Sequence, residues 1–168
     1  MVTLIKETWF IWVIALSFIG IGFLGEWWKK RKEKRELQKW LYQEHTLEEW
    51  KEVDPLQFEK LTALIFEKLG FRTKLIGGPG DKGIDIIAQK EGQNVFIQCK
   101  RMSKVGPNYL REFYGSITDK LKKGDKAVFV TSGLYTLQGK EFARLKNIEL
   151  VDGLILKEMT DSINKQGN

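Results

Sequence analysis

Two short runs rich in β-branched and aromatic residues, 84–88 and 95–100, flank a turn at 90–93 and constrain the fold of this chain most strongly. Two such runs joined by a short, glycine-containing turn are typical of an antiparallel hairpin. A turn centred between residues 91 and 92 places Asp85 opposite Gln98. A shift of one residue would send every side chain of one strand to the other face of the sheet, so the register decides which residues meet.

One face of this hairpin is polar at its end. Because side chains alternate along a strand, Asp85, Gln98 and Lys100 are expected to project from one face, while Cys99 projects from the other face toward a core. An Asp85–Lys100 salt bridge at a sheet edge is one interpretation. The other is a hydrolytic metal site, in which Asp85 and a backbone carbonyl bind Mg²⁺ and Lys100 orients the attacking water and offsets the charge of the transition state.

Helix and strand signals surround the hairpin. Asp54 as N-cap and Pro55 at the first helical position predict a helix that ends at Gly70. The other expected elements are a strand at 73–76, a helix from Pro107 to Gly124, a buried strand at 127–131, a helix at 137–145, a strand at 148–151 and a final helix capped by Asp152. This alternation predicts an α/β fold with a mixed central sheet flanked by helices on both faces.

The loop GPGDKG at 78–83 matches the dinucleotide-binding pattern GxGxxG only formally. That pattern must open a helix, whereas this loop leads into the strand at 84–88, so we reject a dinucleotide site. Asp81 within the loop is either an acidic group behind the metal ligands or a turn-forming residue.

The chain has one cysteine, Cys99, and one histidine, His45. A single cysteine excludes an intrachain disulfide, which suits a reducing cytoplasm. One histidine in a polar segment and one cysteine also exclude a zinc cluster and a Ser-His-Asp or Cys-His nucleophile. If the chain is a catalyst, its chemistry therefore has to use carboxylates, lysine and a recruited metal.

The formal charge of +6 lies mainly in the C-terminal part. Residues 54–168 hold nineteen basic and fourteen acidic residues, against nine and eight in residues 1–53. A basic excess around an acidic site favours a polyanionic partner such as DNA, although an ordinary solvated surface gives the same charge. Near the site, Arg101, Lys104 and Arg111 are either DNA phosphate contacts or solvated charges.

Several motifs occur together in one order: FEKLTALIFEKLGF, GPGDKGIDIIA, FIQCKR, VGPNYLREFYGSI and VTSGLYTLQGKEFA. Across about residues 55–157 the chain resembles the catalytic domain of Mrr-type restriction endonucleases, a branch of the PD-(D/E)xK nucleases. The resemblance implies a restriction-endonuclease-like fold and a Mg²⁺ or Mn²⁺ cofactor. The wider superfamily usually has Asp or Glu where this chain has Gln98, whereas the Mrr branch is similar to this chain.

The resemblance also implies roles for particular residues. It makes Asp85 and Glu59 the acidic metal ligands and makes Gln98 and Lys100 the second half of the catalytic motif. The backbone carbonyl expected beside Asp85 is that of Cys99. Mrr enzymes carry a separate DNA-recognition domain before the nuclease, and this chain has a different N-terminal segment in that place.

Residues 8–25 contain no charged side chain, and with Trp27 and Trp28 the stretch approaches the roughly 20 residues that span a membrane. The basic run KKRKEKR follows, and no small-residue cleavage site precedes it, so an anchor is favoured over a signal peptide. We expect one transmembrane helix in residues 1–28, a partly helical basic linker at 29–53 and an Mrr-like nuclease domain at 54–168. The expected location is the inner (cytoplasmic) membrane, single-pass, with the nuclease in the cytoplasm.

The leading hypothesis is thus a membrane-anchored, metal-dependent DNA endonuclease with a restriction or defence role. One alternative is a membrane-tethered DNA-binding or interaction module that keeps the nuclease fold and cleaves little or nothing. Another is a structure-specific, junction-resolving nuclease acting as a homodimer. DNA is the expected partner in each nuclease hypothesis.

Overall fold

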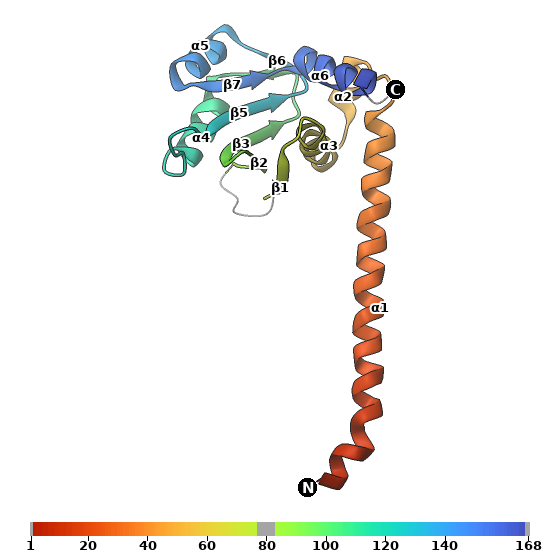
Figure 1. The fold of residues 1–168 in the computed structure, drawn as a ribbon. Helices are drawn as coiled ribbons and strands as arrows, with labels where there is room; N and C mark the ends of the chain where they lie inside the picture. The colour runs from red at the N-terminus through yellow and green to blue at the C-terminus, as the bar shows by residue number, and fades with distance from the viewer. Residues whose placement is uncertain (1, 77–82, 167–168) are drawn as a thin grey trace. The chain divides into compact units, whose positions relative to one another are not determined.

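A computed structural model of the 168-residue chain describes residues 2–76 and 83–166. The chain divides into two compact units, Met1–Lys39 and Trp40–Asn168. Their boundary lies within the expected linker at 29–53. Helix α1 (Val2–Leu41) makes up the first unit except for its last two residues, which belong to the second, an α/β unit (Figure 1).

The helix α1 does not end where the uncharged stretch ends. It is a continuous helix of 40 residues that runs through the basic residues 29–35, so these charges are part of the helix and not a flank. Within the described parts of the chain, no helix combines the length and the apolar character needed to cross a membrane. The prediction of a transmembrane helix in residues 1–28 is therefore wrong, and so is the inner-membrane location that depended on it.

The α/β unit is built on a five-stranded mixed sheet in the order β1-β2-β3-β5-β7. Its strands are β1 (Arg72–Leu75), β2 (Ile86–Lys90), β3 (Gln93–Lys100), β5 (Lys126–Thr131) and β7 (Ile148–Val151). The first three pair antiparallel, and β3, β5 and β7 pair parallel. The predicted mixed sheet is confirmed, and β3 lies at its centre.

Helices cover both faces of this sheet, as the sequence predicts (Figure 1). The helices of this unit are α2 (Leu47–Glu52), α3 (Pro55–Lys68), α4 (Pro107–Ile117), α5 (Leu137–Lys146) and α6 (Gly153–Gln166). On one face α3 packs against β1, β2 and β3 and also contacts α6, and on the other α4 packs with α5. The start of α3 is fixed as expected, because the Asp54 side chain accepts hydrogen bonds from the backbone of Leu56 and Gln57.

The face under α4 and α5 holds a continuous apolar core. Leu110, Phe113 and Ile117 of α4 are fully buried there, and the rings of Phe113 and Phe129 meet edge to face with centroids 5.6 Å apart. These α4 residues are four or three positions apart, so they form one helical stripe. An apolar layer of α4 side chains therefore packs directly against β3 and β5.

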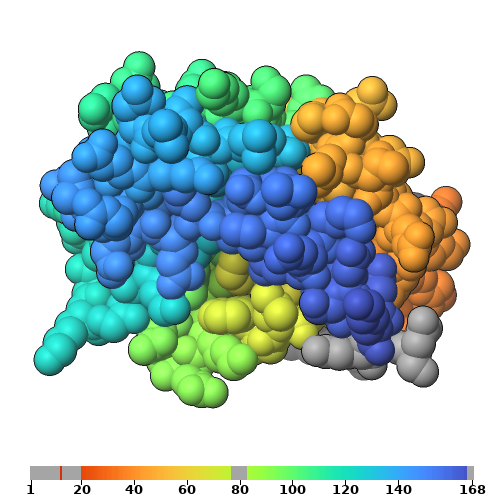
Figure 2. All heavy atoms as spheres, turned by 90° about the horizontal axis from the view of Figure 1, so that it is seen from above, coloured from red at the N-terminus to blue at the C-terminus, as the bar shows by residue number. Residues whose placement is uncertain are grey.

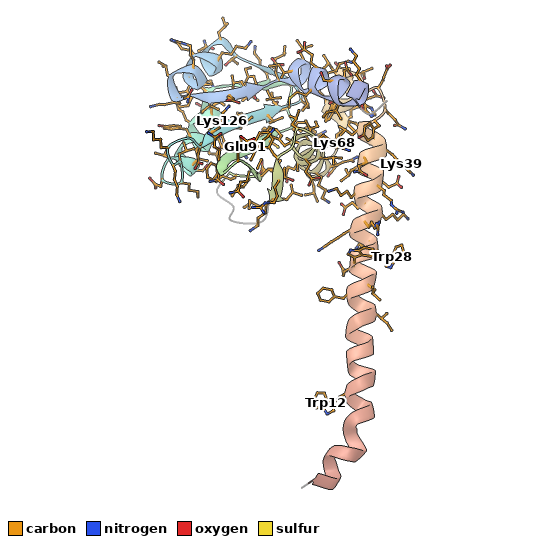
Figure 3. The ribbon with its side chains drawn as sticks, in the orientation of Figure 1. Trp12, Trp28, Lys39, Lys68, Glu91 and Lys126 are labelled. Carbon is orange, nitrogen blue, oxygen red and sulfur yellow. The ribbon has the colours of Figure 1, made fainter. Side chains whose placement is uncertain are left out.

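The carboxyl ends of the parallel strands lie along one edge of the sheet. Lys100 of β3 pairs with Thr131 of β5, and β5 in turn pairs Val130 with Val151 of β7. Glu91, in the β2–β3 turn, and Lys126, at the start of β5, lie at the opposite end of these strands (Figure 3). Ligands of α/β sheets commonly bind at the carboxyl ends of the strands, so a binding site is expected at the edge that carries Lys100.

A short second sheet adjoins that edge. It pairs β4 (Lys104–Val105) with β6 (Leu134–Tyr135) in parallel. The chain leaving β3 passes so close to Gly133 that a Cβ atom there would lie 2.2 Å from the Met102 carbonyl oxygen. Backbone contact replaces side-chain packing at this crossing.

Candidate active site

Asp85 lies directly before β2, with its side chain 7% exposed. The hairpin has the predicted register, since Ile86 pairs with Ile97 and Ile87 with Phe96. Asp85 Oδ2 accepts a hydrogen bond from the backbone N–H of Cys99 at 2.6 Å and another from Gln98 Nε2 at 3.2 Å. The carboxylate is thus held against the edge of β3, and the predicted meeting of Asp85 with Gln98 is confirmed.

Strict alternation of side chains breaks down just before β2. Ile84 packs in the core beneath α4, on the side of Phe96, whereas Ile86 is buried on the other face. The backbone N–H of Asp85 bonds to the carbonyl of Ile97 at 3.0 Å. Asp85 therefore sits beyond the regular ladder, where its side chain reaches the backbone of β3 as well as Gln98.

The Gln98 amide is enclosed by Asp85 and Gly83. Its Nε2 donates to Asp85, and a Cβ atom at Gly83 would lie 2.8 Å from its Oε1. Gly83 has φ +78°, a conformation that also favours glycine. In this arrangement the Gln98 amide donates to one oxygen of the Asp85 carboxylate.

Cys99 contacts Asp85 through its backbone N–H, and the charges of both expected carboxylates act on its thiol. The N–H and C=O groups of one residue point to the same edge of a strand, so the Cys99 carbonyl lies on the edge where its N–H meets Asp85. Its thiol is buried on the α3 face, and burial raises its pKa well above 9.0, with further upward contributions from the negative charges of Asp85 and Glu59. Glu59, half-buried on α3, therefore lies within electrostatic reach of the same sulfur as Asp85.

The raised pKa of Cys99 predicts an alkaline loss of stability. In the unfolded chain the thiol ionises near pH 9.0, but in the folded chain it stays neutral, so its contribution is present below that pH and is lost above it. We expect the free energy of unfolding of the wild type to fall relative to Cys99→Ser by about 1.4 kcal/mol per pH unit above about pH 9. Urea titrations of both proteins at several pH values measure this, and parallel pH profiles would contradict it.

Lys100 is exposed at the end of β3, with its Nζ 5.6 Å from the centroid of the Tyr109 ring on α4. Its backbone is held by Thr131, whose Oγ1 donates to the Lys100 carbonyl at 2.8 Å and lies 3.2 Å from the Met102 carbonyl. Thr131 is fully buried. The sequence did not predict that Thr131 holds the backbone of Lys100. The VTSG segment at the end of the strand was the one signal that included Thr131.

The three expected DNA contacts lie in different surroundings. Arg101 donates from Nη1 to the Lys51 carbonyl at 2.9 Å, which joins the end of β3 to α2. Arg111 bonds to Asn108 on its own helix and lies over the Phe142 ring, while Lys104 is exposed on β4. Asp81 lies outside the described residues. The structure therefore brings Asp85, Gln98 and Cys99 together, with Lys100 on the same strand.

The donor atoms at this site suit a hard cation. In the described part of the chain, no three side chains of the His, Cys, Asp and Glu types gather as a metal site. The expected set instead combines two carboxylates, Asp85 and Glu59, with the backbone carbonyl of Cys99. Oxygen donors in this small number fit Mg²⁺ or Mn²⁺, because Mg²⁺ keeps several waters and commonly uses one or two carboxylates.

Solved structures that share this fold have low sequence identity to the chain. A protein of unknown function, AF1548, is 21% identical with a TM-score of 0.52, over 59% of this chain and 58% of that one. The MspJI restriction endonuclease in complex with a 27-mer oligonucleotide is 20% identical with a TM-score of 0.52, over 80% of this chain and 33% of that one. The chain thus spans between a third and three fifths of these proteins, and the likeness concerns the fold.

Family membership comes from the sequence. No curated protein matches the chain. The family model Mrr_cat, described as restriction endonuclease, matches residues 50–160, close to the 55–157 over which the resemblance was expected. This match includes Glu59, Asp85, Gln98 and Lys100. Because it spans most of the 168 residues, the chain belongs to the Mrr_cat restriction endonuclease family.

Proposed function

We propose that this chain is a Mg²⁺- or Mn²⁺-dependent endonuclease that hydrolyses phosphodiester bonds of DNA. The observation that carries the proposal is the buried Asp85 carboxylate, held by the Cys99 N–H and the Gln98 amide at the end of the strand that presents Lys100. Membership of a restriction endonuclease family supports this reaction class. A restriction or defence role is the corresponding biological proposal.

The side chains have distinct roles in this mechanism. Asp85, Glu59 and the Cys99 carbonyl would hold the cation, which when bound polarises the phosphate and lowers the pKa of a water. Gln98 and the Cys99 N–H fix the direction of the Asp85 carboxylate. Lys100 orients the attacking water and places a positive charge beside the phosphate as its negative charge increases.

DNA as the substrate is supported by charge and by one structural neighbour. The C-terminal part of the chain carries most of the basic excess, which attracts polyanions. The MspJI structure was solved with an oligonucleotide bound. Arg101, Lys104 and Arg111 remain proposed phosphate contacts, and Lys104 is exposed on β4.

We expect Lys100→Ala to reduce nicking of supercoiled plasmid by the full chain about a hundredfold or more, since one preorganised charge contributes that much to stabilising a transition state. Lys126→Ala is the matched control, because Lys126 is an exposed lysine at the opposite end of the adjacent parallel strand (Figure 3). Rates are measured with Mg²⁺, with Mn²⁺ and with EDTA.

The same assay separates the alternatives. Equal rates for wild type and Lys100→Ala would contradict the assigned site. DNA binding without cleavage in either metal would identify the binding or interaction module. Cleavage confined to four-way junctions by a dimeric chain would identify the junction-resolving nuclease.

A further inference from the structure

Helix α1 carries a strongly basic segment at residues 29–39, which begins after Trp28 and ends at Lys39, both labelled in Figure 3. The helix advances about 1.5 Å per residue, so this segment is roughly 15 Å long. Residues 29–36 and Lys39 are exposed. No other segment of this length in the sequence holds as many basic residues, which are Lys29, Lys30, Arg31, Lys32, Lys34, Arg35 and Lys39.

The charges of this part of α1 are sorted by side. At about 100° per residue, one half of the helix carries only basic charges, whereas all the nearby acids fall on the other half. We call the first half the basic face, and its residues are Lys30, Arg31, Lys34, Arg35 and Lys39. The other half holds Glu26, Glu33 and Glu36, together with Lys29 and Lys32. The acids therefore leave most of the basic face uncompensated.

The basic face places like charges next to one another. Lys30 and Lys34 are four residues apart, and Arg31, Arg35 and Lys39 follow one another at the same spacing. Side chains four residues apart in a helix are neighbours, and like charges at this spacing destabilise the helix. One exposed ion pair offsets part of this repulsion, from Lys39 Nζ to Glu36 Oε1 at 3.3 Å, but such pairs contribute little. A bound polyanion removes the repulsion, so the basic face favours an anionic partner.

Double-stranded DNA is the polyanion that fits this face. It carries one phosphate charge per about 1.7 Å of its axis, so a segment of roughly 15 Å passes about nine phosphates. An α-helix also fits into the major groove. A membrane surface fits less well, because a helix that lies on lipid needs an apolar face, and here the side opposite the basic face carries Glu33 and Glu36.

We propose that the basic face of α1 is a second DNA-binding element, which holds duplex DNA by its phosphates without reading its sequence. Contacts from lysine and arginine to phosphate provide affinity but carry no sequence information. The inference goes beyond the cleavage reaction, because this binding needs neither a metal nor Lys100. The basic face therefore raises the affinity for DNA of any sequence.

Binding of the full chain to a short fluorescent duplex in EDTA, measured between about 50 and 200 mM salt, tests the proposal. Each phosphate contact adds about 0.9 to the steepness with which log affinity falls against log salt concentration. Lys30→Gln/Lys34→Gln removes two contacts, so we expect this slope to become shallower by about 1.8 and the affinity to fall about tenfold or more. Glutamine matches lysine in helix propensity, and far-UV circular dichroism verifies that the helix content is unchanged.

Two control variants separate charge on the basic face from charge elsewhere in the chain. Lys30→Arg/Lys34→Arg keeps both charges and is expected to keep the wild-type slope. Lys122→Gln/Lys123→Gln removes two exposed lysines from the turn between α4 and β5, which Figure 2 shows in turquoise, projecting at the lower left of the α/β unit. This turn leads into the start of β5, at the end of the sheet opposite Lys100, so the second control is expected to bind DNA as the wild type does.

An unchanged slope in Lys30→Gln/Lys34→Gln would overturn the proposal, and so would an equal change in Lys122→Gln/Lys123→Gln. The proposal would also be overturned if Lys30→Gln/Lys34→Gln lost affinity for vesicles of phosphatidylcholine and phosphatidylserine but kept its affinity for DNA. In that case a lipid surface would be the partner. A chain that binds DNA through the basic face but cuts no plasmid would support the proposal and overturn the nuclease function. Plasmid cleavage with an unchanged slope in the variant would do the reverse.

Discussion

Asp85→Asn is expected to reduce the rate of DNA cleavage about a thousandfold, because it removes several kcal/mol of metal-dependent stabilisation. The asparagine oxygen can still accept the hydrogen bonds from Cys99 and Gln98, so the change mainly removes the charge. Single-turnover nicking of supercoiled plasmid in Mg²⁺ measures the rate. Fluorescence anisotropy in EDTA is expected to give nearly unchanged DNA affinity.

Asp119→Asn is the matched control, since Asp119 is exposed in the turn after α4. Its cleavage rate is expected to equal that of the wild type. If Asp85→Asn kept more than a tenth of the wild-type rate, Asp85 would not be a catalytic residue.

Gly133→Ala is expected to lower the free energy of unfolding by about 3 kcal/mol or more, at the upper end of overpacking effects. An added Cβ atom would lie 2.2 and 2.3 Å from the carbonyl oxygens of Met102 and Ser103. Those atoms cannot move independently, because Leu134 N–H donates to the Ser103 carbonyl and Gly153 N–H donates to the Gly133 carbonyl. Urea unfolding followed by circular dichroism measures the change.

Gly115→Ala gives the opposite expectation. Gly115 lies in α4, and a Cβ atom there would meet nothing within 4 Å. Alanine at this position is expected to stabilise the chain by about 0.5–1 kcal/mol, because glycine has the higher conformational entropy in the unfolded state. Equal effects of the two substitutions would show that the close backbone crossing at Gly133 does not limit stability.

Local sequence signals were sufficient for much of the site. The turn at 90–93 and the strand period predict the hairpin register that brings Asp85 to Gln98. Asp54 and Pro55 likewise predict the start of α3, which carries Glu59. These features depend on residues near one another in the chain, where turn geometry and capping decide the conformation.

Other features depend on contacts between distant segments, and the sequence did not predict them. The break in alternation at Asp85 depends on where Ile84 packs beneath α4. The clamp on Lys100 depends on Thr131 from a neighbouring parallel strand. The pocket lined by Leu47, Gly133 and Leu154 needs α2, the segment after β5 and α6 together.

The N-terminal prediction failed for a different reason. Composition marks an uncharged run but not the end of a helix, and α1 continues through the charged residues that follow this run. A capping box of Thr46 and Glu49 within the expected linker starts α2, a local signal for a second helix in that segment.

The position of β3 in the sheet has a consequence for the order of folding during synthesis. The Gln98–Asp85 bond joins residues 13 apart, whereas the Thr131–Lys100 bond joins residues 31 apart. Hairpins form within about 1–10 μs, while a ribosome needs about 2–6 s to add that many residues at its usual speed. The acidic part of the site can therefore assemble before β5 pairs with β3, and its lysine is fixed in place only when the parallel strand arrives.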